Sequence, residues 1–302
     1  MKILLQFPEG LKQKALAKAK ELEAEGNWVA ISASPTFGAC DLALDEARAI
    51  GADKLVHFGH SEFCKADFNV EYVECSISAP LGVLPLSVEP LDGLRRICLL
   101  TTIQHVHQLP EIGKFYESKG HEVVLNEPTG ATRKPGQLLG CDAGNVAELD
   151  GSVDAFVYFG GGTFHPTGAL MQTTKPFFSV DPFRMNVERL DRIRAERARR
   201  SKGRIVSALT ARSFGILVST KSGQYHMELA TALAKSVEDA GLVAAILVAN
   251  TFDFESLGNL LEFDAFVNTA CPRLAPDDNG RLRKPLLSAE ELKTVLDLRN
   301  QK

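Results

Sequence analysis

Three cysteines of this 302-residue chain stand in turns where their thiols would be available for chemistry. Cys40 closes a turn of small residues, Cys141 follows the long loop 127–140, and Cys271 follows the apolar run 263–267. Each turn comes after a strand-like segment. In open α/β sheets, ligands collect outside the carboxyl ends of the strands, so these thiols are the first candidates for a functional site.

The spacing of the cysteines restricts the kind of site. The six cysteines form no C-x-x-C pair, so the sequence supports neither a zinc ribbon nor a thioredoxin-type site. Three thiolates from separate loops suit a [4Fe–4S] cluster with one open iron, whereas zinc usually takes a fourth protein ligand. Three unrelated small residues in turns would explain the pattern equally well. Cys75 and Cys98 are interpreted as small buried hydrophobic residues, and the role of Cys64 is left open.

Glycines at two further strand ends are candidates for contact with a small molecule. Gly59 follows one predicted strand, and Gly160, Gly161 and Gly162 follow another. A glycine lets the backbone approach a bulky ligand closely, although ordinary turn chemistry explains each of these glycines as well. His60, beside Gly59, either contacts the ligand or caps the turn.

Two polar residues in the last third of the chain could bind a carboxylate. Gln224 lies in the loop before a predicted helix, and a helix N-terminus favours an anionic group. Arg273 stands beside Cys271 and could pair a carboxylate through two hydrogen bonds. The alternatives are a plain polar loop around Gln224, and an Arg273 that anchors its own loop to Asp277 or Asp278.

The composition is that of an ordinary globular protein. The chain is 45% hydrophobic and 24% charged, with a net charge of −4, so no strong attraction to nucleic acid is expected. No apolar run approaches the ~18 residues that a membrane span requires. The N-terminal apolar stretch is short for a signal peptide and continues into a strand pattern, so we expect a cytoplasmic protein without membrane contact.

Three segments of the chain align with one another and indicate an internal triplication. The segments 52–59, 153–160 and 263–268 share an aspartate followed by an apolar run, with Asp53, Asp154 and Asp264 at equivalent places. Strand-like and helix-like stretches alternate on both sides of each of these aligned segments, which predicts parallel sheets. We therefore expect an α/β protein of three βαβ-type domains with pseudo-threefold symmetry, at residues 1–93, 94–186 and 187–302, whose strand-end loops face a common centre.

Individual elements are also predicted. Continuous apolar runs at 2–7, 28–32, 53–58, 96–101, 121–126, 154–159, 214–219, 242–249 and 264–267 indicate buried strands. Asp41 is expected to cap a short helix that ends near Ile50, and Ser288 to cap a closing helix. The Arg-rich segment 187–204 is interpreted as a solvated connecting helix, with a face for a partner as the alternative.

Several segments resemble the archaeal diphthamide synthase family, an atypical group of radical S-adenosylmethionine enzymes that make 2-(3-amino-3-carboxypropyl)histidine. The similarity runs over essentially the whole chain, and the stretch Asn268-Thr269-Ala270-Cys271-Pro272-Arg273 is its most specific motif. One departure is that Asp41-Leu42-Ala43 follows Cys40, where the family often has a second cysteine and Val-Asp-Asp. The other matching segments are 36–41, 56–61, 140–142, 181–183 and 220–225.

The resemblance implies a function. Cys40, Cys141 and Cys271 would hold a [4Fe–4S] cluster, which when reduced would cleave S-adenosylmethionine at the γ carbon and leave methylthioadenosine. The aminocarboxypropyl radical would add to C2 of a histidine of translation elongation factor 2. A homodimer and an external electron donor are implied as well. The residues singled out on chemical grounds, the strand-end glycines at 59 and 160–162 with His60, Gln224 and Arg273, are then the candidates for contact with S-adenosylmethionine.

Two other functions are compatible with the same residues. Quinolinate synthase resembles this family in its triplicated α/β chain and its three cluster cysteines, but it catalyses a dehydrative condensation. A binding module without a cluster, using a cleft among three domains, is the third alternative. Binding of S-adenosylmethionine would distinguish a diphthamide synthase from a quinolinate synthase. Iron-free protein after anaerobic purification would favour the binding module.

Overall fold

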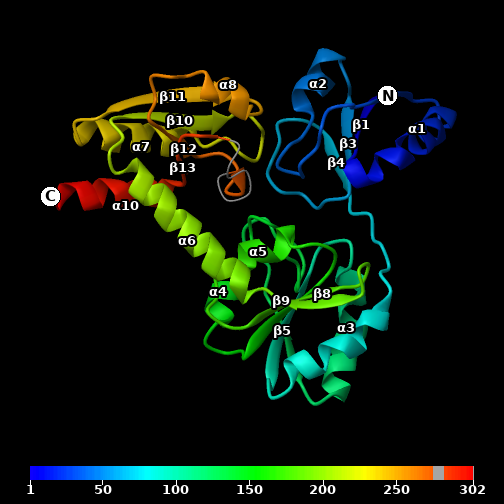
Figure 1. Ribbon diagram of the computed structural model, residues 1–302. Helices are drawn as coiled ribbons and strands as arrows, with labels where there is room; N and C mark the ends of the chain where they lie inside the picture. Colours follow the sequence, from blue (N-terminus) through cyan, green and yellow to red (C-terminus); the bar gives the residue numbers. More distant parts are fainter. Residues whose placement is uncertain (275–281, 302) are drawn as a thin grey trace. The chain divides into compact units, whose positions relative to one another are not determined.

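Within residues 1–274 and 282–301, which the computed structural model describes, three β-sheets with interspersed helices form the framework (Figure 1). The chain separates into two compact units, Met1–Arg194 with two of the sheets and Ala195–Lys302 with the third. Nearly all strand pairs are parallel, which confirms the predicted α/β class. The three-domain division itself stays a prediction.

The first sheet has four parallel strands in the order β2-β1-β3-β4. The cap predicted at Asp41 is wrong, because α2 begins at Leu44, while the Asp41 carboxylate accepts the Phe37 N–H at 3.3 Å. The elements are β1 (Lys2–Gln6), the 3₁₀ helix η1 (Glu9–Lys14), α1 (Ala15–Ala24), β2 (Trp28–Ile31), α2 (Leu44–Ala49), β3 (Lys54–Phe58) and β4 (Val70–Val73).

The second sheet has five strands in the order β6-β5-β7-β8-β9, and only β9 runs antiparallel to its neighbour. Its first part comprises η2 (Leu81–Ser87), η3 (Glu89–Leu91), β5 (Arg96–Thr101), η4 (Val106–Gln108), α3 (Leu109–Ser118) and β6 (Glu122–Leu125). Its second part comprises α4 (Val146–Leu149), β7 (Ala155–Phe159), α5 (Phe164–Leu170), β8 (Phe177–Asp181) and β9 (Asn186–Arg189).

The third sheet again has four parallel strands, in the order β11-β10-β12-β13. The cap predicted at Ser288 is confirmed, because its hydroxyl accepts the Glu291 N–H while the Glu291 carboxylate accepts the Ser288 N–H. The elements are α6 (Asp191–Ala208), β10 (Ser213–Ser219), α7 (Met227–Asp239), β11 (Val243–Ala249), α8 (Phe254–Gly258), β12 (Ala265–Asn268), β13 (Leu286–Leu287) and α10 (Ala289–Asn300).

One strand order recurs in all three sheets. The first strand of each repeat lies between the second and third strands, and a fourth strand pairs with the third. The aligned aspartates serve this arrangement, because each carboxylate accepts the backbone N–H at the start of the first strand of its repeat. Asp53 accepts from Lys2 at 2.7 Å, Asp154 from Arg96 at 2.8 Å, and Asp264 from Ser213 at 3.2 Å. The internal repeat is therefore visible in both topology and side-chain contacts.

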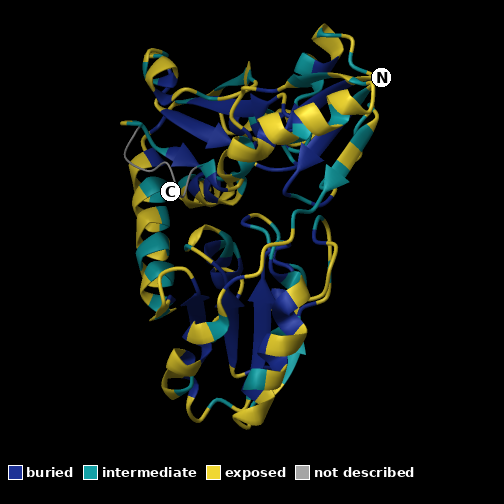
Figure 2. Cartoon of the chain, turned by 90° about the vertical axis from the view of Figure 1, so that its right-hand side faces the viewer, coloured by how far each residue is buried: buried dark blue, intermediate teal, exposed yellow. Residues whose placement is uncertain are grey.

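Burial of apolar strands against helices supplies the core of each sheet. Figure 2 shows the strands largely in the colour of buried residues, while the outer faces of the helices are exposed. β7 and β8 are buried along their whole length, as expected of strands covered on both faces. In the part of the chain that the structure describes, no helix combines the length and the apolar character needed to cross a membrane.

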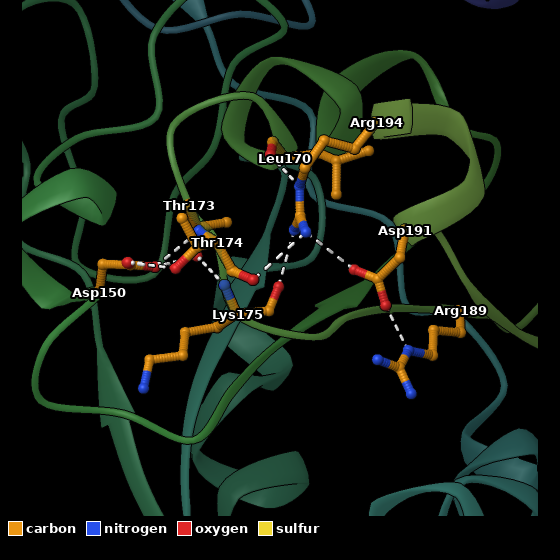
Figure 3. Close-up of polar contacts among 8 residues, drawn as sticks. All are labelled: Asp150, Leu170, Thr173, Thr174, Lys175, Arg189, Asp191 and Arg194. Carbon is orange, nitrogen blue, oxygen red and sulfur yellow. Dashed lines mark hydrogen bonds and ion pairs between the residues drawn. The ribbon is translucent and has the colours of Figure 1, made fainter. Parts of the chain in front are cut away.

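The Arg-rich helix is present but begins later than predicted, at Asp191, because residues 186–189 pair with β8 as strand β9. Figure 3 shows the start of α6 attached to the loop after α5. Arg194 donates to the carbonyl oxygens of Leu170 at 3.1 Å and Lys175 at 2.7 Å, and pairs with Asp191 at 3.1 Å. The same loop is held from its other side, since Asp150 accepts hydrogen bonds from residues 173 and 174.

Candidate metal centre

The three candidate cysteines all lie in loops after the carboxyl ends of parallel strands. Cys40 follows β2, Cys141 follows β6, and Cys271 follows β12. Cys141 is exposed, and the other two are partly buried. Cys98 differs, because it is buried within β5 and burial raises the pKa of its thiol to about 12. Its interpretation as a core residue is confirmed, and a thiolate ligand at that place is disfavoured.

A network of hydrogen bonds shapes the loop that carries Cys141. The Asp142 carboxylate accepts the N–H groups of Ala131 at 2.5 Å, Thr132 at 3.2 Å and Gly144 at 2.9 Å. The Asn126 amide donates to two carbonyl oxygens of the same loop, at 3.0 and 3.1 Å. A long Pro/Gly-rich segment is thus drawn together around the residue next to Cys141, so its thiol is presented from an ordered loop.

Close glycine packing also holds this loop against α5. A Cβ at Gly168 would lie 2.9 Å from the Gly140 carbonyl carbon and closer still to its oxygen. A Cβ at Gly140 would lie 2.6 Å from the Phe164 ring. Two glycines therefore allow the backbone before Cys141 to rest directly on the helix.

The turn that carries Cys271 is built by its own residues. Asn268 donates from its amide to the Cys271 carbonyl at 2.7 Å, and its amide oxygen accepts the Ala270 N–H at 3.0 Å. The Thr269 hydroxyl donates to the Leu217 carbonyl on β10 at 2.8 Å. An asparagine that bonds to its own turn in this way keeps the following residues in a compact conformation.

Two of the glycines predicted to contact a ligand, Gly59 and Gly162, have structural roles of their own. Gly59 has φ of 85° and accepts a hydrogen bond from Gln104 at 2.9 Å, and Gly162 has φ of 70°. The Gly162 N–H donates to Asp181 at 3.1 Å, so this group is already satisfied within the protein. Burial alone would raise the pKa of Asp181, but backbone donors, Gly162 among them, hold it below its usual value. Ligand contact by residues 59 and 160–162 stays a prediction.

The remaining predicted contacts lie in the second unit, apart from His60. Gln224 and Arg273 are both buried, at 8% exposure, although they are polar and stand in loops. Lys221 is buried to the same degree and its ammonium donates to Asn250 at 3.1 Å. The alternative partners of Arg273, at positions 277 and 278, lie outside the described residues.

Arg133 connects the loops that follow β3 and β6 within the first unit. Its guanidinium donates to the Glu62 carbonyl at 3.0 Å, two residues beyond His60. Arg133 itself belongs to the loop that leads to Cys141, and no motif in the sequence pointed to it. Gln6 and His57 were missed as well, although a polar side chain inside an apolar, buried strand is a signal that could have identified both.

The donor chemistry of the three cysteines fits an iron–sulfur cluster. Thiolates are the soft ligands that Fe–S clusters take, and the three loops leave their cysteines accessible to different degrees. Within neither unit do the described residues group three His, Cys, Asp or Glu side chains that could hold one metal ion. Cys40 and Cys141 belong to the first unit and Cys271 to the second, so the convergence of the three stays a prediction.

The recurring strand order and the thiols at strand ends define a triplicated α/β protein with soft sulfur donors on its loops. The model of the diphthamide synthesis protein family matches residues 7–302. The chain is 34% identical to 2-(3-amino-3-carboxypropyl)histidine synthase of Pyrococcus horikoshii, covering 99% of this chain and 87% of that protein. It is 31% identical to subunit 1 of the same synthase from Homo sapiens, covering 98% and 68%.

The chain belongs to the diphthamide synthesis protein family. Its fold agrees with this membership. The crystal structure of Dph2 from Pyrococcus horikoshii with a 4Fe-4S cluster superposes with a TM-score of 0.90 at 32% identity, covering 100% of this chain and 87% of that chain. The resemblance drawn from the sequence motifs is confirmed.

Proposed function

We propose that this protein transfers the 3-amino-3-carboxypropyl group of S-adenosylmethionine to a histidine of translation elongation factor 2, the first step of diphthamide biosynthesis, and releases methylthioadenosine. The observation that carries the proposal is the agreement, over nearly the whole chain, with proteins named 2-(3-amino-3-carboxypropyl)histidine synthase. The shared fold with a cluster-containing relative supports it.

We propose Cys40, Cys141 and Cys271 as the ligands of a [4Fe–4S] cluster. When bound, this group supplies an electron and an open iron for the sulfonium of S-adenosylmethionine. The chain's contribution is to present three thiolates from three differently built turns. The hydrogen bonds of Asp142 and Asn268 order two of these turns, and the domain division at residues 93/94 and 186/187 would assign one cysteine to each repeat.

The polar residues near these turns would orient the cosubstrate. The Arg273 guanidinium suits the methionine carboxylate, and Gln224 would assist from the loop before α7. His60 and the glycines at 59 and 160–162 would line the remaining contact surface. Partial burial of this set would exclude water from the reacting atoms and strengthen each polar contact.

The family resemblance and the sequence suggest the assembly and the setting of the proposed reaction. A homodimer, an external one-electron donor and a cytoplasmic location accompany the proposal. Elongation factor 2 is the protein substrate, and no membrane or nucleic acid partner is required.

The decisive experiment is anaerobic incubation of reduced protein with S-adenosylmethionine and elongation factor 2, with mass spectrometry of the target histidine. A gain of one aminocarboxypropyl group supports the proposal. An unmodified histidine, with S-adenosylmethionine left uncleaved, contradicts it and favours a condensing enzyme if iron is present, or a binding module if iron is absent.

The ligand set has its own test. Cys40→Ala, Cys141→Ala and Cys271→Ala should each lower the iron content after anaerobic reconstitution. Cys98→Ala is the matched control, because that thiol is buried in β5 and should not affect iron binding. Equal iron in all four variants would rule out this ligand set.

A further inference from the structure

A chain of hydrogen bonds runs through buried strands of the first sheet and ends beside the Cys40 turn. It joins Gln6 at the end of β1, His57 on β3, and His60 just after β3. Gln6 is 2% exposed and His57 is fully buried, although both are polar. Buried polar side chains on a sheet require a reason, since each must satisfy its hydrogen bonds within the protein.

The orientation of the Gln6 amide is determined by backbone groups. Its nitrogen donates to the Asp41 carbonyl at 2.6 Å, and that oxygen can only accept. Its oxygen accepts the Ala43 N–H at 3.1 Å, and that group can only donate. The two bonds agree, so the atom that faces His57 is the amide oxygen.

This orientation determines the tautomers of both histidines. The Gln6 oxygen lies 2.9 Å from Nδ1 of His57, which must therefore carry a hydrogen. Nε2 of His57 lies 2.9 Å from Nδ1 of His60. In a neutral His57 this Nε2 is an acceptor, so Nδ1 of His60 carries the hydrogen and Nε2 of His60 keeps a lone pair.

The neutral state of both rings follows from their surroundings. Burial, and to a smaller extent the nearby His60, lowers the pKa of His57 to about 3. Burial also lowers the pKa of His60, although a hydrogen bond with the Phe58 backbone partly opposes this effect.

The lone pair of His60 faces the turn of the first candidate ligand. A Cβ built at Gly38 would lie 3.9 Å from His60 Nε2 and 3.8 Å from Cys40 Sγ. The two atoms therefore border the same space next to Gly38. His60 is only partly buried, so this nitrogen can accept a hydrogen bond from a ligand.

We propose that Gln6 and His57 are positioning residues that hold His60 as the Nδ1–H tautomer, so that its Nε2 accepts a hydrogen bond from the ammonium group of S-adenosylmethionine. The tautomer rests on the hydrogen bonds together with the complete burial of His57, which keeps that ring neutral, whereas the identity of the ligand rests on the proposed function. A lone pair selects a cationic N–H donor and rejects a carboxylate, which complements the role of Arg273.

The tautomer is tested by long-range ¹H–¹⁵N NMR spectra of the full chain, which distinguish a protonated ring nitrogen from a bare one. His105 and His121 are internal references, since each donates from Nδ1 to a backbone carbonyl, at 2.8 and 2.7 Å. The parent should show His60 in the same form. His57→Phe should shift His60 toward the Nε2–H form, while His121→Phe should leave it unchanged. A parent protein with a bare Nδ1 at His60 overturns the proposal.

The ligand contact is tested by affinity. His60→Phe should bind S-adenosylmethionine about tenfold more weakly, the minimum for loss of one charge-assisted hydrogen bond. Methylthioadenosine, which lacks the ammonium group, should bind equally to both proteins. His60→Gln, whose amide oxygen replaces the acceptor, should recover most of the affinity.

The outcomes separate the inference from the proposed function. An equal loss for both ligands overturns the ammonium contact. A parent protein that binds no S-adenosylmethionine overturns the proposed function and this ligand, while the NMR spectra still decide the positioning role of Gln6 and His57.

Discussion

Replacement of Gly168 by alanine tests whether the loop before Cys141 depends on direct backbone contact with α5. Gly168 lies inside this helix, where alanine alone would stabilise by about 0.5–1 kcal/mol. The added Cβ, however, would lie 2.9 Å from the Gly140 carbonyl carbon, whereas Cβ atoms essentially never come within 3.0 Å of such neighbours. The obstacle is backbone, which cannot rotate away as a side chain would.

The expected magnitude follows from these opposing terms. Overpacking costs about 1–3 kcal/mol, and a backbone obstacle places this site in the upper part of that range. We therefore expect Gly168→Ala to lower the free energy of unfolding by about 1–2 kcal/mol after the gain in helix propensity. The displaced Gly140 immediately precedes Cys141, so the iron content after reconstitution should fall as well.

The chain offers a matched control in Gly203, which also lies within a helix but has no heavy atom within 4 Å of a built Cβ. Gly203→Ala should raise the free energy of unfolding by about 0.5–1 kcal/mol and leave iron content unchanged. Urea denaturation followed by circular dichroism measures both variants. If Gly168→Ala proves as stable as Gly203→Ala and retains full iron, the proposed contact between loop and helix is wrong.

Three further predictions concern the supports of the fold and the site. Backbone hydrogen bonds from Arg96 and Arg212 lower the pKa values of Asp154 and Asp264, so their stabilisation is complete above the ordinary carboxyl pKa of about 4 and is lost as pH falls below it. Urea midpoints measured from pH 6 down to pH 3 should thus fall less steeply in Asp154→Asn than in the parent, and identical slopes would contradict this. Glu291→Gln should lower the free energy of unfolding by about 3 kcal/mol, because it breaks a nearly buried ion pair with Arg204 at 2.5 Å; an unchanged urea midpoint would refute that value. Asn268→Ala should lower the free energy of unfolding by about 1–2 kcal/mol and speed the loss of iron to a chelator. If the variant loses iron as slowly as the parent protein, the Cys271 turn does not need the Asn268 side chain.

Local sequence determined most of the strands. Each repeat has apolar runs of four to eight residues, and nine such runs became strands β1, β2, β3, β5, β6, β7, β10, β11 and β12 with shifts of at most one residue at either end. A buried parallel strand needs apolar side chains on both faces, so its signal is carried by consecutive residues. The aligned aspartates revealed the repeat for a similar reason, because each one meets the same backbone group in its own sheet.

The strands β4, β8, β9 and β13 were not predicted, and the structure shows a reason for β9 and β13. They lie toward one edge of each sheet, and β9 and β13 are only four and two residues long. A strand this short exists through its pairing with a neighbour and not through its own pattern. The start of α6 was misplaced by the same effect, since residues 186–189 have helix-compatible side chains but pair with β8.

By itself, the sequence determined the α/β class, the triple repeat, the family, and the strand-end position of Cys40, Cys141 and Cys271. Each of these features depends only on consecutive residues or on short motifs. Only the tertiary structure showed the hydrogen bonds that link Gln6, His57 and His60. It also showed the contact of Arg133 with the loop after β3 and the closeness of Gly168 to Gly140. Those contacts join residues far apart along the chain, and hydrogen-bond direction and steric overlap depend on distances that a linear pattern does not contain.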